Sequence, residues 1–589
     1  MNKEWFELKD ARRKDWNKSV WITLRAINTI SEKGKIGHLG YESEFFGLGS
    51  AAFPLEQIDK IKKLGWSDIG ISHEHAGYVD GDDYIPCDIF CSSFREVEGL
   101  NLVIEQKGEG DFKRVWYLHP DLITTLGLYR EGDVWICPRE GYEEVVRVSF
   151  REEKPVSIEI KSKYLKDYLC ARGLFLYLTA FYSRESITED DVTSLWSDEE
   201  NNINDENIRW EGRVIPIHEG GHPFGSKMSV FHVFRTDVEE DDELPDLSAI
   251  PSDNNTHSEQ WEKTFEGRKL YRILGELWKD SIVNPSQQSR MVRGDKIPSS
   301  IYFVVDLEGT RLCGDELIES GKWLWFKPDV MSVLSKRRGG ELNFYSRYTG
   351  GVACYDGYNT HFGVNELGLI NVYAKDIGLL PEWQQQIWAG YNCSPEGGIS
   401  KELYMSQVRA EPAESQSPEE FFPVVLNELN KKTQDLFGFN LFRDHESIPE
   451  IIKSINRFRS LDEASFYDLA KDLARVIADN IDASAIQKVV APPKGEKWGS
   501  LKSLEKLLTS RFDNSVVRKV TAPLVGIYEL RHADAHLPSS KIEEAFKLIE
   551  IDRSLPFVVQ GEQMLHIVVS ALYMVLEGFK QWHGHDARS

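Results

Sequence analysis

Residues 417–437 read SPEEFFPVVLNELNKKTQDLF, and this stretch marks the point where strand patterns stop and helical patterns begin. Ser417 is suited to cap a helix that begins at Pro418. The first turn of that helix then carries Glu419 and Glu420, which face unpaired backbone N–H groups and the positive end of the helix dipole. The sequence therefore predicts a helix that starts at Pro418.

Amphipathic patterns with helical spacing continue from there to the end of the chain. Short Pro, Gly, Ser or Asn signals separate them, and short loops between amphipathic helices imply an antiparallel bundle. The most apolar segment is interrupted by His566 and Glu577, so we expect a buried helix there and not a membrane span. The segments with helical spacing are 460–481, 500–512, 515–536, 539–551 and 557–582.

Upstream of residue 410 the patterns are mixed. Residues 143–150 and 154–162 alternate like two strands joined by a turn, whereas the apolar spacing of residues 267–283 predicts a helix. Acidic or Pro/Ser-rich stretches interrupt the chain and indicate linkers, because they cannot bury enough apolar surface to fold. We expect a multidomain α+β protein with an N-terminal α+β domain (1–236), an acidic linker (237–265), an α+β middle domain (266–409), a second linker (410–418) and an all-α C-terminal bundle (419–589).

The charge of the 589-residue chain is unevenly distributed. Its net charge of −25 argues against a protein that coats nucleic acid, because phosphate binding needs a basic footprint. Residues 421–589 hold 22 Lys and Arg against 23 Asp and Glu, which leaves 48 against 72 for residues 1–420. The C-terminal part is therefore neutral and compatible with a limited nucleic-acid contact.

The cysteine content and the start of the chain indicate the compartment. Seven scattered Cys residues, an odd and sparse set, predict reduced thiols and a cytoplasmic protein. The opening residues MNKEWFELKD are charged and lack the apolar region of a signal peptide. No apolar run approaches the roughly 20 residues that cross a bilayer, so no membrane partner is expected.

Two groups of residues have the composition of a zinc site. His218, Glu219 and His222 match the H-E-x-x-H pattern of zinc hydrolases, which requires a helix to place both imidazoles on one face. The intervening Gly220 and Gly221 each cost about 1 kcal/mol in a helix, so a Gly-rich loop between strands is the simpler interpretation. A zinc-dependent hydrolase is kept as an alternative.

The second group contains two histidines and two cysteines, His73, His75, Cys87 and Cys91. Their spacing matches no common zinc knuckle, in which paired thiolates usually lie two to four residues apart. A strand with incidental thiols explains them more simply. We therefore expect neither a metal nor a cofactor.

Charged and titratable residues cluster near the end of the predicted helix 515–536. Arg531, His532, Asp534 and His536 fall within six positions, just before Pro538. Arg–His pairs at similar spacing occur elsewhere in the chain, so the spacing alone is not informative. This pair differs because it lies at the end of a helix in the predicted bundle.

In that context LRHADAHLP (530–538) resembles the R-polar-x-x-x-H signature of the HEPN superfamily, a group of α-helical domains found in prokaryotic toxins and antiviral ribonucleases. The polar position holds His532, where the family often has Asn. The resemblance implies a metal-independent endoribonuclease with Arg531, His532 and His536 as catalytic residues, RNA as substrate and no cofactor. It also implies a homodimer or higher even oligomer through the bundle, and a role in antiphage defence by abortive infection.

In that setting, residues 1–410 would act as a sensor or regulator that responds to a phage-derived trigger. An imidazole near neutral pH is a suitable general acid or base, and a guanidinium grips phosphate through paired donors. Residues five apart on a helix point about 140° apart, so either the helix breaks or two copies complete the site. Two simpler interpretations of this cluster stay open. It is either a solvated helix end with an Arg531–Asp534 ion pair, or part of a catalytically silent bundle that binds a nucleotide or a protein.

Overall fold

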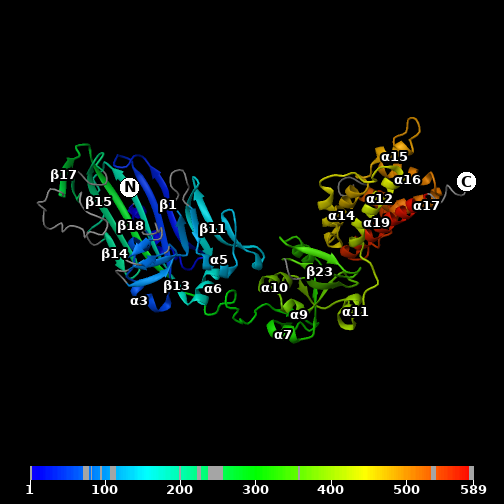
Figure 1. The fold of residues 1–589 in the computed structure, drawn as a ribbon, viewed down its shortest axis with the longest axis horizontal. Coiled ribbons are helices and arrows are strands. Elements are labelled where there is room, and N and C mark those ends of the chain that lie inside the picture. Colours follow the sequence, from blue (N-terminus) through cyan, green and yellow to red (C-terminus); the bar gives the residue numbers. More distant parts are fainter. Residues whose placement is uncertain are drawn as a thin grey trace. The chain divides into compact units, whose positions relative to one another are not determined.

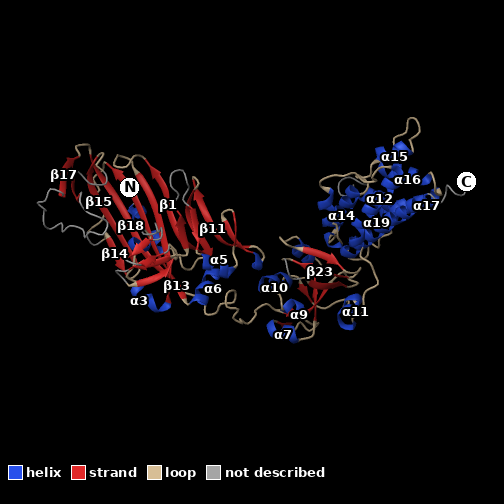
Figure 2. Ribbon diagram, viewed as in Figure 1, coloured by secondary structure: helices blue, strands red, loops and turns tan. Residues whose placement is uncertain are grey.

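The computed structural model describes residues 3–70, 78–80, 83–85, 87–92, 96–106, 115–197, 200–221, 227–235, 256–355, 359–531 and 539–582. The chain forms two compact units, the first containing Met1–Pro138 and Tyr142–Ile297, the second Arg139–Gly141 and Pro298–Ser589. Strands dominate the first unit and the beginning of the second, and helices make up the C-terminal part (Figures 1 and 2). The mixed α+β class expected from the sequence is confirmed at this level.

The first unit is built on a twelve-stranded sheet whose paired strands are antiparallel. The predicted hairpin over 143–162 is present as β11 and β12, in which Val148 pairs with Ile158. Outside the main path of the sheet, β6 (Val97–Leu100) pairs with β2 on one side and with β5 (Ile89–Ser92) on the other. The main path runs β14 (Asn202–Asp205), β15 (Ile208–His218), β18 (Lys269–Val283), β13 (Leu174–Thr188), β2 (Glu42–Pro54), β1 (Trp21–Lys33), β12 (Lys154–Lys161), β11 (Glu143–Arg151), β10 (Val134–Cys137) and β9 (Tyr129–Glu131).

Alternate residues of the central strands enter cores on opposite faces of this sheet. Leu176 and Leu178 of β13 pack in one core with helices α5 (Pro120–Leu126) and α6 (Ser162–Arg172). Tyr177, which lies between them in the strand, packs in another core with α3 (Ile58–Ile61) and α4 (Trp66–Ile69). The sheet is therefore covered on both faces.

The helix predicted over 267–283 is wrong, because this segment forms strand β18. It pairs along its length with β13 on one side and β15 on the other, from Leu176 opposite Val283 to Thr188 opposite Tyr271. A central strand buried on both faces carries apolar residues on both, which breaks simple alternation and imitates helical spacing. Gly275 is required because an added Cβ would lie 2.0 Å from the carbonyl oxygen of Phe6.

The first unit also extends beyond the domain boundary expected at residue 236. It reaches Ile297, and part of the predicted linker 237–265 is strand β17 (Thr256–Thr264), paired with β16 (Lys227–Arg235). Residues 236–255 lie outside the described part of the chain. The end of the stretch predicted as a linker is therefore part of a strand pair.

The second unit begins with a smaller antiparallel sheet, here called the middle sheet. Its core contains Phe326, Phe362 and Trp388, all nearly inaccessible to solvent. Helices α7 (Gly314–Glu319), α8 (Asp329–Ser335), α9 (Ala374–Gly378), α10 (Glu382–Ala389) and α11 (Lys401–Arg409) accompany it. The strand order is β22 (Glu341–Phe344), β23 (Thr349–Ala353), β24 (Thr360–Val364), β25 (Ile370–Tyr373), β21 (Trp323–Phe326) and β26 (Asn392–Cys393).

The described residues between 418 and 582 form the helical region, which begins at Pro418 as predicted. Ser417 does not cap the backbone; its hydroxyl donates to the Glu419 carboxylate at 2.8 Å. The helices share one core that includes Leu429, Leu473 and Leu572. They are α12 (Pro418–Phe437), α13 (Ile448–Ser454), α14 (Glu463–Val476), α15 (Ala483–Val489), α16 (Ser500–Thr509), α17 (Asn514–Leu530), α18 (Ser539–Ile549) and α19 (Phe557–Lys580).

Helix α19 is the single helix among the described residues that is long and apolar enough to cross a membrane. Most of its apolar side chains lie inside the core of the helical region, among them Leu565, Leu572 and Phe579. The expectation of a buried helix over 557–582 is confirmed.

A buried polar junction joins the helical region to the middle sheet within the second unit. Arg457, in the short helix η4 (Arg457–Arg459), donates to Glu419 of α12 from Nε at 2.7 Å and Nη2 at 2.8 Å. Its Nη1 donates to the backbone carbonyl of Arg347, which follows β22, at 2.7 Å. The side chains of Arg457 and Glu419 are 1% and 5% exposed. Burial alone raises the pKa of Glu419, but the adjacent guanidinium outweighs burial and holds that pKa below its ordinary value.

We expect the substitution Arg457→Met to lower the free energy of unfolding of the second unit by about 3–5 kcal/mol, because it leaves the Glu419 carboxylate buried and unpaired. Urea unfolding of the full chain would measure the loss. The double variant Arg457→Met/Glu419→Leu should recover most of it, since an apolar pair removes both charges together. A change below about 1 kcal/mol for Arg457→Met, comparable with the exposed control Arg518→Met, would contradict this account.

Candidate functional site at the end of α17

The end of helix α17 is fixed by the core of the helical region. Ile527 and Leu530 are buried there, and the backbone N–H of Arg531 donates to the carbonyl of Ile527 at 3.2 Å. Helix α18 packs closely against this end, since an added Cβ at Gly526 would lie 2.7 Å from Cγ2 of Ile549. The backbone that carries Arg531 is therefore held in place on two sides.

The Arg531 side chain is partly exposed and lies beside Asp479 and Tyr528. Its Nη1 makes an ion pair with Asp479, in the turn that follows α14, and its guanidinium lies 4.7 Å from the centre of the Tyr528 ring. The side chain of Arg531 is 22% exposed and that of Asp479 is 44% exposed. The hydrogen bond and the charge of Asp479 hold the pKa of Arg531 above its ordinary value. A charged, oriented guanidinium is thus available at this surface.

The other predicted members of the site are His532, Asp534 and His536, which lie outside the described residues, as does Pro538. The structure therefore places Arg531 alone of this group, and its pairing with His536 stays a prediction. The Arg531–Asp534 ion pair considered from the sequence is likewise untested, whereas the pair with Asp479 is present. Asp479 lies 52 residues upstream, so no local sequence pattern pointed to it.

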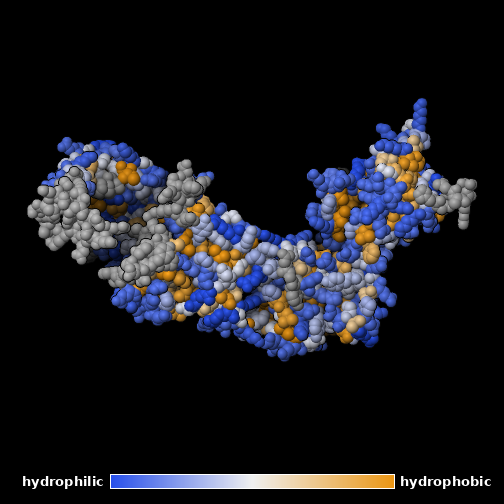
Figure 3. Space-filling model, viewed as in Figure 1, coloured by the Kyte–Doolittle hydropathy of each residue, from blue (hydrophilic) through white to orange (hydrophobic). Residues whose placement is uncertain are grey.

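A basic segment, defined here as residues 483–520, lies over α15, α16 and the start of α17. It holds eight Lys and Arg against three Asp and Glu in a chain of net charge −25. Seven of the eight cations are exposed, and the loop between α15 and α16 projects as hydrophilic surface (Figure 3). Arg518 is thirteen residues before Arg531, or roughly 20 Å along the helix axis. The net charge of residues 421–589 is close to zero, so counting charges over that whole range did not reveal the basic segment. Counting over shorter ranges of the sequence does reveal it.

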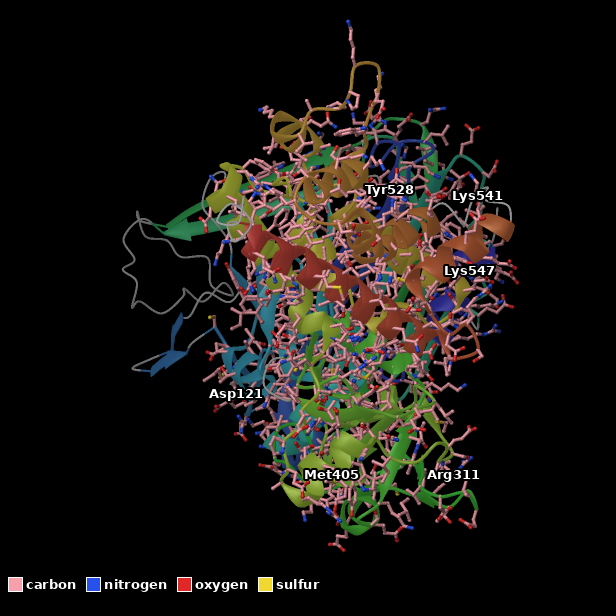
Figure 4. All side chains as sticks on the ribbon, turned by 90° about the vertical axis from the view of Figure 1, so that its right-hand side faces the viewer. Asp121, Arg311, Met405, Tyr528, Lys541 and Lys547 are labelled. Atoms are coloured by element: carbon pink, nitrogen blue, oxygen red, sulfur yellow. The ribbon has the colours of Figure 1, made fainter. Side chains whose placement is uncertain are left out.

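Helix α18, which follows Arg531 in the chain, carries two lysines and also the exposed Glu543 and Glu544, so it adds no net positive charge. Lys541 and Lys547 are exposed, and Figure 4 shows them on the side of the helical region where Tyr528 is labelled. Helix α18 packs along α17, and no ion pair of either lysine is found within the described residues.

The H-E-x-x-H candidate does not form the helix that zinc hydrolysis requires. His218 is the last residue of β15, and its Nδ1 lies 2.9 Å from the carbonyl oxygen of Gly267. Glu219 follows in a turn and accepts a hydrogen bond from Nε of Arg268 at 2.9 Å, which holds the pKa of Glu219 below its ordinary value. His222 lies outside the described residues. The zinc hydrolase alternative is therefore contradicted by the strand and turn at this position.

The second zinc candidate is described only in part. Cys91 lies in strand β5, as the simpler interpretation expected, and Cys87 lies just before that strand. His73 and His75 lie outside the described residues. Over the described part of the chain, no three His, Cys, Asp or Glu residues come together as metal ligands, and none of the seven cysteines forms a disulfide.

Comparisons with known proteins give no further guide to this site. No family model, curated protein or solved structure matches the chain. We therefore infer a function from the side chains at the end of α17 and from the charge around them.

We expect Arg531→Ala and Asp479→Ala each to lower the free energy of unfolding by less than about 1 kcal/mol, because a partly exposed ion pair contributes little to stability. Urea unfolding would measure both variants against the wild type. A loss of several kcal/mol for Arg531→Ala would show that the guanidinium has a structural role and would remove it as a candidate for catalysis.

Proposed function

We propose that the protein is a metal-independent endoribonuclease of the HEPN type, with the helical region as its catalytic part. The observation that carries this proposal is the position of Arg531, a charged and partly exposed guanidinium at the end of α17, directly before the His532–His536 segment. The basic segment supports RNA as the substrate, since it supplies the positive charge that the chain as a whole lacks.

The proposed reaction uses the RNA's own 2′-hydroxyl as the nucleophile. His536 as general base takes the 2′-OH proton, the 2′ oxygen attacks the adjacent phosphorus, and the bond to the 5′ oxygen breaks. A protonated imidazole, from His532 or from a second copy of His536, returns a proton to the leaving oxygen. Arg531 stabilises the additional negative charge on the phosphoryl oxygens. The products are a 2′,3′-cyclic phosphate and a 5′-hydroxyl.

The pair with Asp479 is compatible with this role. Because that ion pair is partly exposed, exchanging its carboxylate for a phosphate costs little free energy. Residues five apart on one helix do not share a face, so we expect a homodimer, or a higher even oligomer, in which Arg531 and His536 meet across the helical regions. Asp479 then keeps Arg531 oriented until RNA arrives.

The resemblance to the HEPN superfamily also implies a biological setting for this activity. A ribonuclease of this size has no chemical need for the first 410 residues, so we assign them a sensing or regulatory role that responds to a phage-derived trigger. The proposed setting is antiphage defence by abortive infection in the prokaryotic cytoplasm. In this view the large sheet of the first unit recognises the trigger.

A catalytically silent helical region that binds a nucleotide or a protein is the second candidate. The observation in its favour is that Arg531 is already paired with Asp479. The two candidates are distinguished by RNA cleavage. Only the ribonuclease produces RNA with 2′,3′-cyclic phosphate ends.

The wild-type chain should cleave RNA in the presence of EDTA and leave 2′,3′-cyclic phosphate ends. We expect Arg531→Ala and His536→Ala each to lower the cleavage rate by about a hundredfold or more, because each removes a group needed in the transition state. Gel assays of a labelled RNA, with mass spectrometry of its ends, would measure both effects. Arg475→Ala and His445→Ala, at exposed positions elsewhere in the helical region, are matched controls that should cleave normally. Equal rates for all four variants would reject the site.

The basic segment predicts a specific dependence of RNA affinity on salt. Replacing four of its cations by Gln should lower the slope of log affinity against log salt by up to about three, since each phosphate contact to a single strand contributes about 0.7. Fluorescence anisotropy at several salt concentrations would measure the slope. The cations to replace are Lys494, Lys497, Lys502 and Arg518, and a control with equal charge loss replaces Lys33, Lys35, Lys60 and Lys63 of the first unit. Equal slopes for both variants would place the RNA elsewhere.

A further inference from the structure

A cavity of about 530 Å³ lies between the middle sheet and the helical region of the second unit. Its walls come from the turn after β22, the end of β24, the start of α11, the short helix η4 and the start of α19. This volume lies in the range of binding sites for small molecules in proteins. The cavity has no role in the proposed RNA chemistry at Arg531.

The guanidinium of Arg347 lines one side of the cavity and is held by hydrogen bonds to α19. Arg347 donates to Glu562 of α19 from Nε at 2.7 Å and from Nη2 at 3.0 Å. Its backbone N–H donates to Ser415 at 3.0 Å, and its carbonyl accepts from Arg457. The third nitrogen of this guanidinium, Nη1, has no hydrogen-bond partner among the described residues. Arg347 therefore offers one unused donor at a fixed position.

Two exposed side chains of opposite charge also line the cavity. Lys401, at the start of α11, and Glu366, just after β24, are both without an ion-pair partner in the described part of the chain. A second carboxylate, that of Glu402, accepts a hydrogen bond from the uncharged Ser346 hydroxyl at 2.5 Å. Positive and negative groups with no protein counter-ion thus face the same space.

The unpaired charges around the cavity have both signs. Arg347 is paired with Glu562 and Arg457 with Glu419, which leaves Lys401 together with the carboxylates of Glu366 and Glu402 in the lining. A strongly anionic ligand such as a nucleotide would face the two carboxylates, and a cation would face Lys401. A ligand that carries one charge of each sign suits this lining best, because each of its groups meets an opposite charge.

The rest of the lining is aliphatic. Val364 and Val558 are 5% and 2% exposed, and Ile399, Leu555 and Val559 complete the apolar surface. Burying an apolar group against such a surface stabilises a complex by roughly 25 cal/mol for each Å² removed from water. The ligand should therefore carry an aliphatic or aromatic group in addition to its two charges.

We propose that this cavity binds a zwitterionic ligand of amino-acid or dipeptide size with an apolar side chain. Its carboxylate contacts Lys401 and Nη1 of Arg347, its ammonium group contacts Glu366 and Glu402, and its side chain packs on the valines. Because the walls belong to both the middle sheet and the helical region, the bound ligand bridges the two parts. This assignment is independent of RNA cleavage and holds whether or not Arg531 is catalytic.

Calorimetry on the full chain would test the assignment with five probes: L-leucine, the dipeptide Leu-Leu, N-acetyl-leucine, leucine amide and AMP. We expect L-leucine or Leu-Leu to bind and to raise the thermal unfolding midpoint of the second unit. N-acetyl-leucine lacks the ammonium group and leucine amide lacks the carboxylate, so each should bind at least about tenfold more weakly. The single amino acid and the dipeptide distinguish the two sizes of ligand.

Two variants test the named residues. Glu366→Gln and Lys401→Met should each weaken binding of the zwitterion by about tenfold or more, whereas the exposed controls Glu446→Gln and Lys471→Met should bind normally. All four positions are exposed, so the variants should fold, which circular dichroism would verify. The proposal is overturned by no binding of L-leucine or Leu-Leu at millimolar concentration. It is equally overturned if AMP, N-acetyl-leucine or leucine amide binds as tightly as the free zwitterion. Unchanged binding of the zwitterion in both Glu366→Gln and Lys401→Met would also overturn it.

Discussion

The ion pair between Arg457 and Glu419 is the interaction on which the second unit depends. It lies where the helical region meets the middle sheet, and almost no water reaches it. Through the Arg347 carbonyl it connects to a second pair, Arg347 with Glu562, so that η4, α12, α19 and the turn after β22 share one polar network. The buried charges of this network are paired with each other, which fixes the relative positions of these elements. Arg347, Arg457 and Glu562 of this network also line the cavity, so these parts of its wall have fixed positions.

Local signals identified the long helices after Pro418 but not the central strands. Over its described residues each segment predicted there contains a helix, because an apolar stripe is a property of the segment itself, whereas the short helices α13 and α15 were not predicted. The strand β18 was mistaken for a helix because its apolar residues reflect neighbours on both sides and both faces, which only the assembled sheet defines. The β11–β12 hairpin was recognised because its two strands adjoin in sequence.

The candidate sites show the same limit. Arg531 was found because a short motif surrounds it, but its partner Asp479 comes from another helix end and has no signature in sequence. The cavity combines side chains from residues 347 to 563, none of which forms a motif with its sequence neighbours. Conversely, His218 and Glu219 matched the H-E-x-x-H pattern by spacing alone. His218 lies in a strand, which does not provide the helical geometry that this zinc pattern requires.

The pairing of β13 with both β2 and β18 has a consequence for synthesis of the chain. Its partners begin at residues 42 and 269, so the middle of the large sheet consists of contacts that are remote in sequence. High contact order slows folding, because the entropy of closing long loops is lost before the strands pair. On the ribosome, β2 and β13 emerge long before β18, and β13 then has an open edge. The nascent first unit is therefore the stage at which this protein is most exposed to aggregation and most in need of a chaperone.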